Sequence, residues 1–120
     1  MNAGQTLGIL AEVVDERVRQ DAKWGEQNHP NGTGPGVVWT LPGRHPAALM
    51  ATRARDMCQE ADRRGECTWL LIALEEMAAA FAESNPYELR REVLQLVAVG
   101  VTWIEAIDRA AARKAAGCGS

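Results

Sequence analysis

The sequence has few of the features that mark a secreted protein. It contains three cysteines, Cys58, Cys67 and Cys118, with neither a CxxC pair nor the Cys/His spacing of a zinc site. An odd number of cysteines without a disulfide framework fits reduced thiols in the cytosol. We therefore expect a cytoplasmic protein whose cysteines are buried or incidental to its function.

The sequence also lacks a basic excess and any long apolar run. Its formal net charge is −3, and no basic stretch precedes an apolar core near the N-terminus. A membrane span needs roughly 18 consecutive apolar residues, and surfaces that bind nucleic acid or anionic lipid are basic. We expect a soluble protein that has neither a membrane nor polymeric nucleic acid as its partner.

Strand signals are almost absent, apart from the brief run Val37-Val38-Trp39, and helical periodicity dominates. The composition, 47% hydrophobic and 24% charged, fits one domain over residues 1–120. We predict an all-α four-helix bundle with a flexible tail from about residue 114. The first expected helix covers about residues 4–23, with apolar positions Leu7, Leu10, Val14 and Val18, and the second runs from Pro46 to Arg63. The third runs from Trp69 to Glu83 and is capped by Thr68. The fourth runs from Asn85-Pro86 to about Arg113, with Glu88 reaching back to the cap.

Glycine and proline are concentrated between residues 25 and 46, which predicts a long loop between the first two helices. A loop of this length is either a lid that faces a substrate or a mobile excursion. No Gly-Lys-Ser/Thr follows its glycines, so a phosphate-binding P-loop is not indicated. The last helix is apolar over a wide arc from Val93 to Ile107, more than one small subunit covers, and we therefore expect a dimer or tetramer.

Carboxylates interrupt the apolar C-terminal half at two places. Glu75 and Glu76 lie in the third expected helix, and Glu92 lies in the fourth, after the Ser84-Asn85-Pro86 break. An ionised carboxylate in apolar surroundings is costly unless it is paired, hydrogen-bonded or bound to a metal. Oxygen ligands on two adjoining helices favour Mg²⁺, or alternatively Mn²⁺. The competing interpretation is a solvated helix face whose acids pair with neighbouring cations.

The acidic motifs resemble those of a known family. Glu75-Glu76-x-x-Ala79 followed by Glu92-x-x-Gln95 is similar to the EExxE and ExxD motifs of the MazG-like all-α nucleoside triphosphate pyrophosphohydrolases. The resemblance extends over about residues 8 to 110. Segments similar to small phage and actinobacterial members are residues 16–30 (ERVRQDAKWGEQNHP), Thr68-Trp69, residues 92–99 and residues 103–109.

The resemblance implies a helical bundle that assembles as a dimer or a larger oligomer. It also implies cleavage of a nucleoside triphosphate between its α and β phosphates, giving a monophosphate and pyrophosphate with the help of Mg²⁺. Glu76 and Glu92 match metal-ligand positions. Glu75 matches the adjoining acid, which is either a ligand or the base that activates water.

Two positions depart from the family motifs. Ala79 stands where the first motif ends in glutamate, and Gln95 stands where the second has aspartate. Gln95 retains a carbonyl oxygen that can coordinate a cation, Ala79 has no ligand atom, and Glu83, one turn further along, is a possible substitute. The alternatives to an active enzyme are a catalytically impaired relative that binds nucleotides or a protein, and a helical interaction module.

Candidates for binding the nucleotide lie near the end of the first helix. An indole can stack on a base and amides can read its edge, which favours Trp24, Gln27 and His29, while Lys23 can neutralise phosphate. Each has a structural alternative: a core or loop-anchoring indole for Trp24, a turn residue before Pro30 for His29, and a surface cation for Lys23. The indoles of Trp69 and Trp103 are predicted to lie in the core or in an interface.

Overall fold

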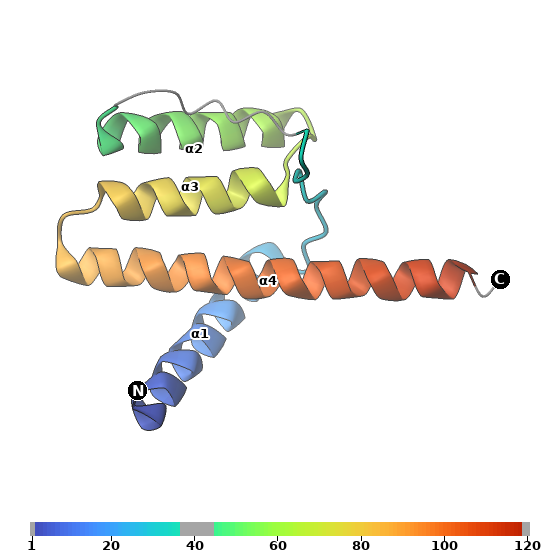
Figure 1. Cartoon of the computed structure of the whole chain (residues 1–120), viewed down its shortest axis with the longest axis horizontal. Coiled ribbons are helices and arrows are strands. Elements are labelled where there is room, and N and C mark those ends of the chain that lie inside the picture. Colours follow the sequence, from blue (N-terminus) through green and yellow to red (C-terminus); the bar gives the residue numbers. More distant parts are fainter. Residues whose placement is uncertain (1, 37–44, 119–120) are drawn as a thin grey trace. The chain divides into compact units, whose positions relative to one another are not determined.

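The computed structural model describes residues 2–36 and 45–118, and over these ranges it contains four helices and no strand (Figure 1). The predicted all-α class is confirmed. The helices are α1 (Ala3–Trp24), α2 (Ala47–Arg63), α3 (Trp69–Ala82) and α4 (Pro86–Cys118). They begin and end close to the predicted positions except for α4, which passes Arg113 because its alanine-rich tail favours helix. Val37-Val38-Trp39 and the centre of the predicted 25–46 loop lie outside the described residues.

Side-chain caps set the starts of α1, α3 and α4. Asn2 Oδ1 accepts a hydrogen bond from the Gln5 amide at 3.1 Å, and Thr68 Oγ1 accepts one from the Leu71 amide at 3.2 Å. Each bond satisfies one of the free N–H groups in a first helical turn. The predicted cap at Thr68 is therefore confirmed.

The cap of α4 differs in one detail from the prediction. Asn85 Oδ1 accepts hydrogen bonds from the Tyr87 and Glu88 amides at 2.9 and 3.3 Å, as expected of a capping asparagine. Glu88 does not reach back to the Asn85 amide, because that amide donates to Glu83 Oε1 at 3.0 Å, and Glu88 instead pairs with Arg91 at 2.6 Å. The expected reciprocal capping box is thus wrong, since Glu83 already satisfies the amide.

The chain forms two compact units, and α4 contributes to both. The first unit contains residues up to Asn28 and from Val97 onward, and the second contains residues 29–96. In the second unit, α2 and α3 pack side by side and are joined by a short turn (Figure 1). The turn follows a Schellman pattern at Gly65, whose φ is +68°: the Glu66 and Gly65 amides donate to the Ala61 and Asp62 carbonyls.

Trp69 is the largest fully buried side chain, with 1% of its surface exposed. Its predicted core position is confirmed. Small side chains accompany it in the core of the second unit, which lets the helices approach closely. The other buried residues of this unit are Ala54, Cys58, Ala78 and Ala80.

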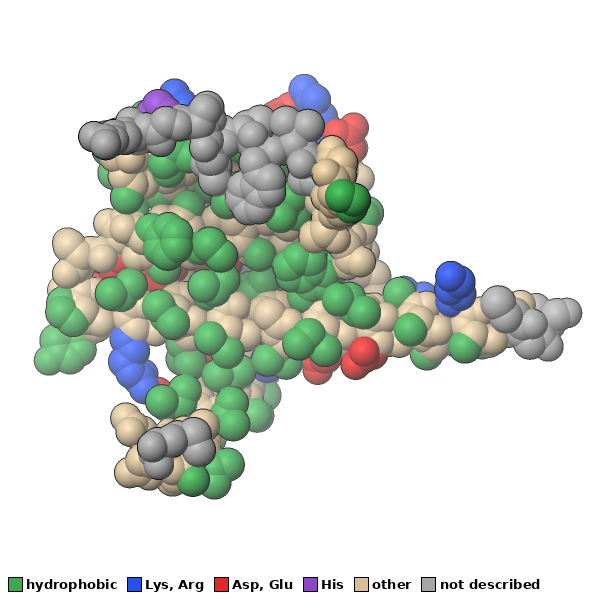
Figure 2. Space-filling model, in the orientation of Figure 1, with side chains coloured by type: hydrophobic (Ala, Val, Ile, Leu, Met, Phe, Trp, Pro, Cys, Tyr) green, Lys and Arg blue, Asp and Glu red, His purple; other side chains and the backbone are tan. Residues whose placement is uncertain are grey.

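The first unit combines α1 with residues 97–118 of α4. Arg17 Nη2 lies 2.8 Å from Glu105 Oε1, and the Thr102 hydroxyl donates to Gln20 Oε1 at 3.4 Å. Most of the apolar stripe of α1 is exposed, and Figure 2 shows many hydrophobic side chains on the surface in view. The stripe consists of Leu7, Leu10, Val14 and Val18, each at least half exposed. Within the described ranges, no helix has both the length and the apolar character needed to cross a membrane.

Candidate functional site

The predicted acidic residues all lie in the second unit, on α3 and on the first part of α4. Glu75, Glu76 and Glu92 are half-buried, as is the carboxamide of Gln95. This burial arises because the apolar residues of α3 and α4 surround each polar position in the sequence. The acids therefore lie in partly dehydrated surroundings, where a counter-charge or a hydrogen-bond donor has the largest effect.

Glu92 and Gln95 form a pair on one face of α4, three residues apart. Neither side chain makes a hydrogen bond or an ion pair with any residue in the described part of the chain. A half-buried carboxylate without a partner is unfavourable, so these oxygen atoms are available to a ligand. We call this pair the Glu92–Gln95 pair.

Glu75 has a different environment, because its carboxylate lies near enough to the Cys58 thiol of α2 to raise the pKa of that thiol. Burial raises the pKa of the Cys58 thiol far above its ordinary value, and the hydrogen bond to Glu75, the Glu75 charge and the contact with Cys67 raise it further. Burial also raises the pKa of Cys67, although its hydrogen bond with Cys58 acts in the opposite direction. Cys58 and Cys67 are free thiols in the described part of the chain.

Glu76 follows Glu75 in the helix, and successive side chains project about 100° apart around a helix axis. The two acids therefore leave α3 in different directions. Glu75 raises the pKa of the Cys58 thiol on α2, whereas Glu76 is not among the groups that do so. The α2 face that carries Cys58 was expected from its spacing, but the influence of Glu75 on it was not.

Glu83 was predicted as a substitute ligand on the same helical stripe as Glu76. In the structure Glu83 is the C-cap of α3, with extended backbone angles of φ −90° and ψ 125°. Its carboxylate accepts the hydrogen bond from the Asn85 amide. Glu83 thus stabilises the turn between α3 and α4, and it does not continue the helical stripe.

The described residues contain no group of three or more His, Cys, Asp or Glu side chains arranged to hold a metal ion. A resident site built wholly from such ligands does not fit this donor set. Mg²⁺, however, commonly binds through one or two carboxylates while phosphates and water complete its shell. The Glu92–Gln95 pair, with its unpartnered oxygen atoms, fits a cation that arrives together with a phosphate-bearing substrate.

The predicted nucleotide-binding residues belong to different units. Lys23, Trp24 and Gln27 are in the first unit, and His29 is in the second. Trp24 ends α1 with 60% of its surface exposed, and the Lys23 ammonium lies 4.7 Å from the centre of its ring. This cation–π contact leaves an indole at the surface, and the alternative of a buried core indole does not apply to Trp24.

The segment that follows α1 is fixed by Arg109 of α4. The Arg109 guanidinium donates to the Gln27 carbonyl at 2.8 Å and to Asn28 Oδ1 at 3.1 Å, and it pairs with Glu26 at 3.2 Å. A guanidinium has several donors in a fixed plane, which suits it to holding several groups of a loop at once. Gln27 is therefore held through its backbone carbonyl, and its side chain is half-buried.

His29 and the residues after it have a structural task that sequence reasoning missed. The carbonyls of Pro30 and Asn31 accept hydrogen bonds from the Trp69 and Leu70 amides at 2.9 and 3.0 Å, so this segment completes the cap of α3. The imidazole of His29 packs edge-on against the Trp69 indole, with ring centres 5.0 Å apart. The available signal was the Pro-Asn-Gly turn, but the sequence does not show where that turn docks.

The arrangement as a whole provides oxygen donors on α3 and α4 that can bind a hard cation or accept a proton from water. Nothing in the described site supplies a thiolate nucleophile, since burial holds both described cysteines in the thiol form. A comparison of the chain with protein families, with characterised proteins and with solved structures finds no match.

Proposed function

We propose that the chain is a Mg²⁺-dependent nucleoside triphosphate pyrophosphohydrolase of the MazG-like all-α type, which converts a nucleoside triphosphate to a monophosphate and pyrophosphate. The observation that carries the proposal is the Glu92–Gln95 pair, whose half-buried oxygen atoms have no partner in the described chain. A cation bound to phosphates supplies the missing partner. The motif resemblance at Glu75, Glu76 and Glu92 points to the same chemistry.

Each polar residue has a separate role in this proposal. Glu76, Glu92 and the carbonyl oxygen of Gln95 hold the cation, whose contribution is to neutralise phosphate charge and orient the scissile bond. Glu75 accepts the proton of the attacking water, as a general base does. Ala79 contributes no ligand, so we expect a slow enzyme in comparison with one that has four acidic ligands.

The proposed base-recognition residues are Lys23, Trp24, Gln27 and His29. An exposed indole such as Trp24 offers a flat surface on which any nucleobase can stack, and Lys23 adds a positive charge beside it. His29 is already packed against Trp69, which makes it the weakest of the four candidates.

A direct assay tests the proposal. The purified protein is incubated with a panel of canonical and modified nucleoside triphosphates plus Mg²⁺ or Mn²⁺, and monophosphate and pyrophosphate are measured. Glu76→Gln and Glu92→Gln should each abolish turnover. The matched control is Glu88→Gln on the same helix, because Glu88 is exposed and paired with Arg91, and this variant should retain activity.

Two further outcomes decide between this function and its main alternative. Ala79→Glu should raise the rate if the natural chain is a weakened enzyme. No turnover with any triphosphate, together with metal-dependent nucleotide binding that Glu92→Gln removes, would instead favour a catalytically impaired nucleotide-binding relative.

We also propose that the chain assembles as a homodimer or homotetramer through α1. The exposed stripe residues Leu10, Val14 and Val18 line a groove of about 630 Å³ together with Val101 of α4. The Arg17–Glu105 ion pair borders the same groove. An apolar centre with a charged border is the usual anatomy of a protein interface, and a second copy would remove this apolar surface from water.

A further inference from the structure

An exposed apolar stripe runs along the part of α4 that belongs to the first unit. Its positions are Val97, Gly100, Ile104 and Ile107, at intervals of three, four and three residues. This spacing places them on one face of the helix, as in the seam of a coiled coil. The aliphatic side chains of Val97, Ile104 and Ile107 are 43, 60 and 45% exposed. We call these four positions the α4 stripe.

The α4 stripe is separate from the face through which α4 contacts α1. That face carries Thr102, Glu105 and Arg109, whose side chains bond to Gln20, to Arg17 and to the segment after α1. At about 100° per residue, the two sets of positions project from nearly opposite sides of α4. The groove along α1 is also lined by none of the four stripe positions. The first unit therefore uses one side of α4 to hold α1 and leaves the stripe side exposed.

Gly100 is the unusual member of the α4 stripe. A glycine inside a 33-residue helix is less favourable than an alanine, and Gly100 does not have the positive φ that would require a glycine. A Cβ added at Gly100 would meet no atom of another described element within 4 Å. Packing within the described chain therefore does not account for this glycine. A missing side chain between Val97 and Ile104 does, however, let the backbone of a second helix approach closely.

A second copy of α4 fits the α4 stripe. In an isologous contact, a two-fold axis makes two copies present the same surface to one another. An axis perpendicular to α4 at Gly100 sets two glycines opposite each other. It also brings Val97 of one copy near Ile104 of the other, because these residues lie three positions before and four positions after Gly100. The stripe is uncharged, so this contact avoids repulsion between two chains that each have a net charge of −3.

We propose that the α4 stripe is a self-association surface, at which α4 of a second copy crosses at Gly100. This surface is distinct from the proposed interface through α1. Two different isologous contacts on one subunit close into a tetramer, whereas either contact alone gives a dimer. The inference goes beyond the proposed function, and it depends neither on turnover nor on the α1 contact.

Sedimentation velocity over a concentration series tests the surface. Gly100→Leu fills the space that the second helix needs, and Ile104→Asp places a charge in the contact. Each variant should halve the mass of the assembly, from tetramer to dimer if α1 also associates and from dimer to monomer if it does not. The dissociation constant should rise at least about tenfold. The matched control is Ala116→Leu, which should sediment like the unaltered chain, because Ala116 is exposed and lies on the opposite side of α4 from Gly100.

Gly100→Ala separates lost association from lost folding. Alanine favours the helix more than glycine does, so circular dichroism should show helix content that is retained or increased, while association weakens. A folding defect would instead lower both. An unchanged mass in folded Gly100→Leu and Ile104→Asp would overturn the proposal, as would an equal loss of mass in Ala116→Leu. An unaltered chain that is monomeric at every concentration would overturn this proposal and the α1 interface together.

Oxidative cross-linking tests whether the partner at the stripe is the same helix of a second copy. Gly100→Cys and Ala116→Cys are compared in a Cys118→Ser background, with copper phenanthroline as the oxidant and non-reducing electrophoresis as the readout. A disulfide needs Cα atoms within about 7 Å, so Gly100→Cys should form covalent dimers at least about tenfold faster than Ala116→Cys. Equal rates would overturn the crossing at Gly100 and would leave the stripe to α1 of a second copy or to another protein.

Discussion

α1 and α3 both carry many apolar residues, yet they bury them to very different extents. On α3, Trp69 is fully buried and packs within the second unit, and the leucines that follow are half-buried. On α1, Val13 alone is buried among the described residues, while the stripe at Leu7, Leu10, Val14 and Val18 is exposed. Apolar spacing therefore identifies a face that favours burial, but within the described ranges the chain covers this face on α3 and leaves most of it exposed on α1.

The two indoles Trp69 and Trp24 provide the largest expected contrast. Trp69→Ala removes a fully buried ring and should lower the free energy of unfolding by about 3–5 kcal/mol. Trp24→Ala removes an indole that is 60% exposed and should change the stability by less than about 1 kcal/mol. Urea unfolding followed by circular dichroism measures both. Similar losses in the two variants would show that the first unit depends on Trp24 for its folding.

Neighbouring valines on α1 separate packing within the chain from assembly. Val13 is 4% exposed, and Val13→Ala should cost about 2 kcal/mol of stability, since two buried methyl groups are lost. Val14 is 61% exposed, and Val14→Asp should leave a monomer folded but abolish self-association through the α1 groove. Sedimentation velocity measures the assembly, with Asp15→Ala as an exposed control. A Val14→Asp variant that sediments like the unaltered chain would disprove α1 as the interface.

The contrast between the helices also shows which features can be predicted from sequence. The helix starts at Thr68 and Asn85 could be predicted because a cap acts within three residues of its own position. The burial of Trp69 could be predicted from its apolar neighbours. These features depend on local hydrogen bonds and on hydrophobic periodicity, both of which are visible in a short window of sequence.

Other features depend on contacts between distant residues and have no local signal. The docking of Pro30 and Asn31 on the start of α3 uses backbone groups, which every residue possesses. Likewise, Glu75 and Glu76 are the same residue type in adjacent positions, so only the packing of α2 decides which of them raises the pKa of the Cys58 thiol. The candidate acids could be named from the sequence, but their separate directions could not.

A substitution at Gly32 tests the docking of Pro30 and Asn31 on the start of α3, which sequence reasoning missed. Gly32 has a φ of +74°, and a Cβ at this position would lie 2.7 Å from Thr68 Cβ. Gly32→Ala should therefore cost about 1–2 kcal/mol through the left-handed backbone and the clash. The control is Gly36→Ala, where an added Cβ meets nothing within 4 Å. Thermal unfolding compares the two variants, and equal melting temperatures would mean that the segment does not dock on α3.

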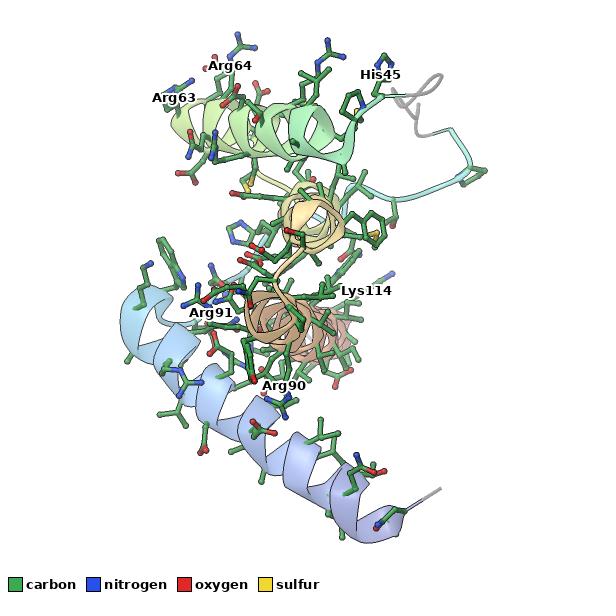
Figure 3. All side chains as sticks on the ribbon, turned by 90° about the vertical axis from the view of Figure 1, so that its left-hand side faces the viewer. His45, Arg63, Arg64, Arg90, Arg91 and Lys114 are labelled. Atoms are coloured by element: carbon green, nitrogen blue, oxygen red, sulfur yellow. The ribbon has the colours of Figure 1, made fainter. Side chains whose placement is uncertain are left out.

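The smallest expected effect concerns a surface ion pair at the end of α2. Glu60 pairs with Arg63 and with Arg64, the latter at 2.9 Å, and both arginines lie on the outer side of α2, away from α3 (Figure 3). The hydrogen bond and charge of Arg63, followed by the hydrogen bond of Arg64, hold the pKa of Glu60 below its ordinary value of 4.5.

A lowered pKa in the folded state means that this pair stabilises the fold above about pH 4.5 and ceases to do so as the pH falls through the folded-state value. Exposed pairs of this kind contribute little and are screened by salt, so Glu60→Gln should differ only slightly from the unaltered chain at pH 7, and the difference should vanish at pH 2–3 or in high salt. Urea midpoints of both proteins over this pH range measure the effect, and a difference that grows on acidification would reverse the assigned sign.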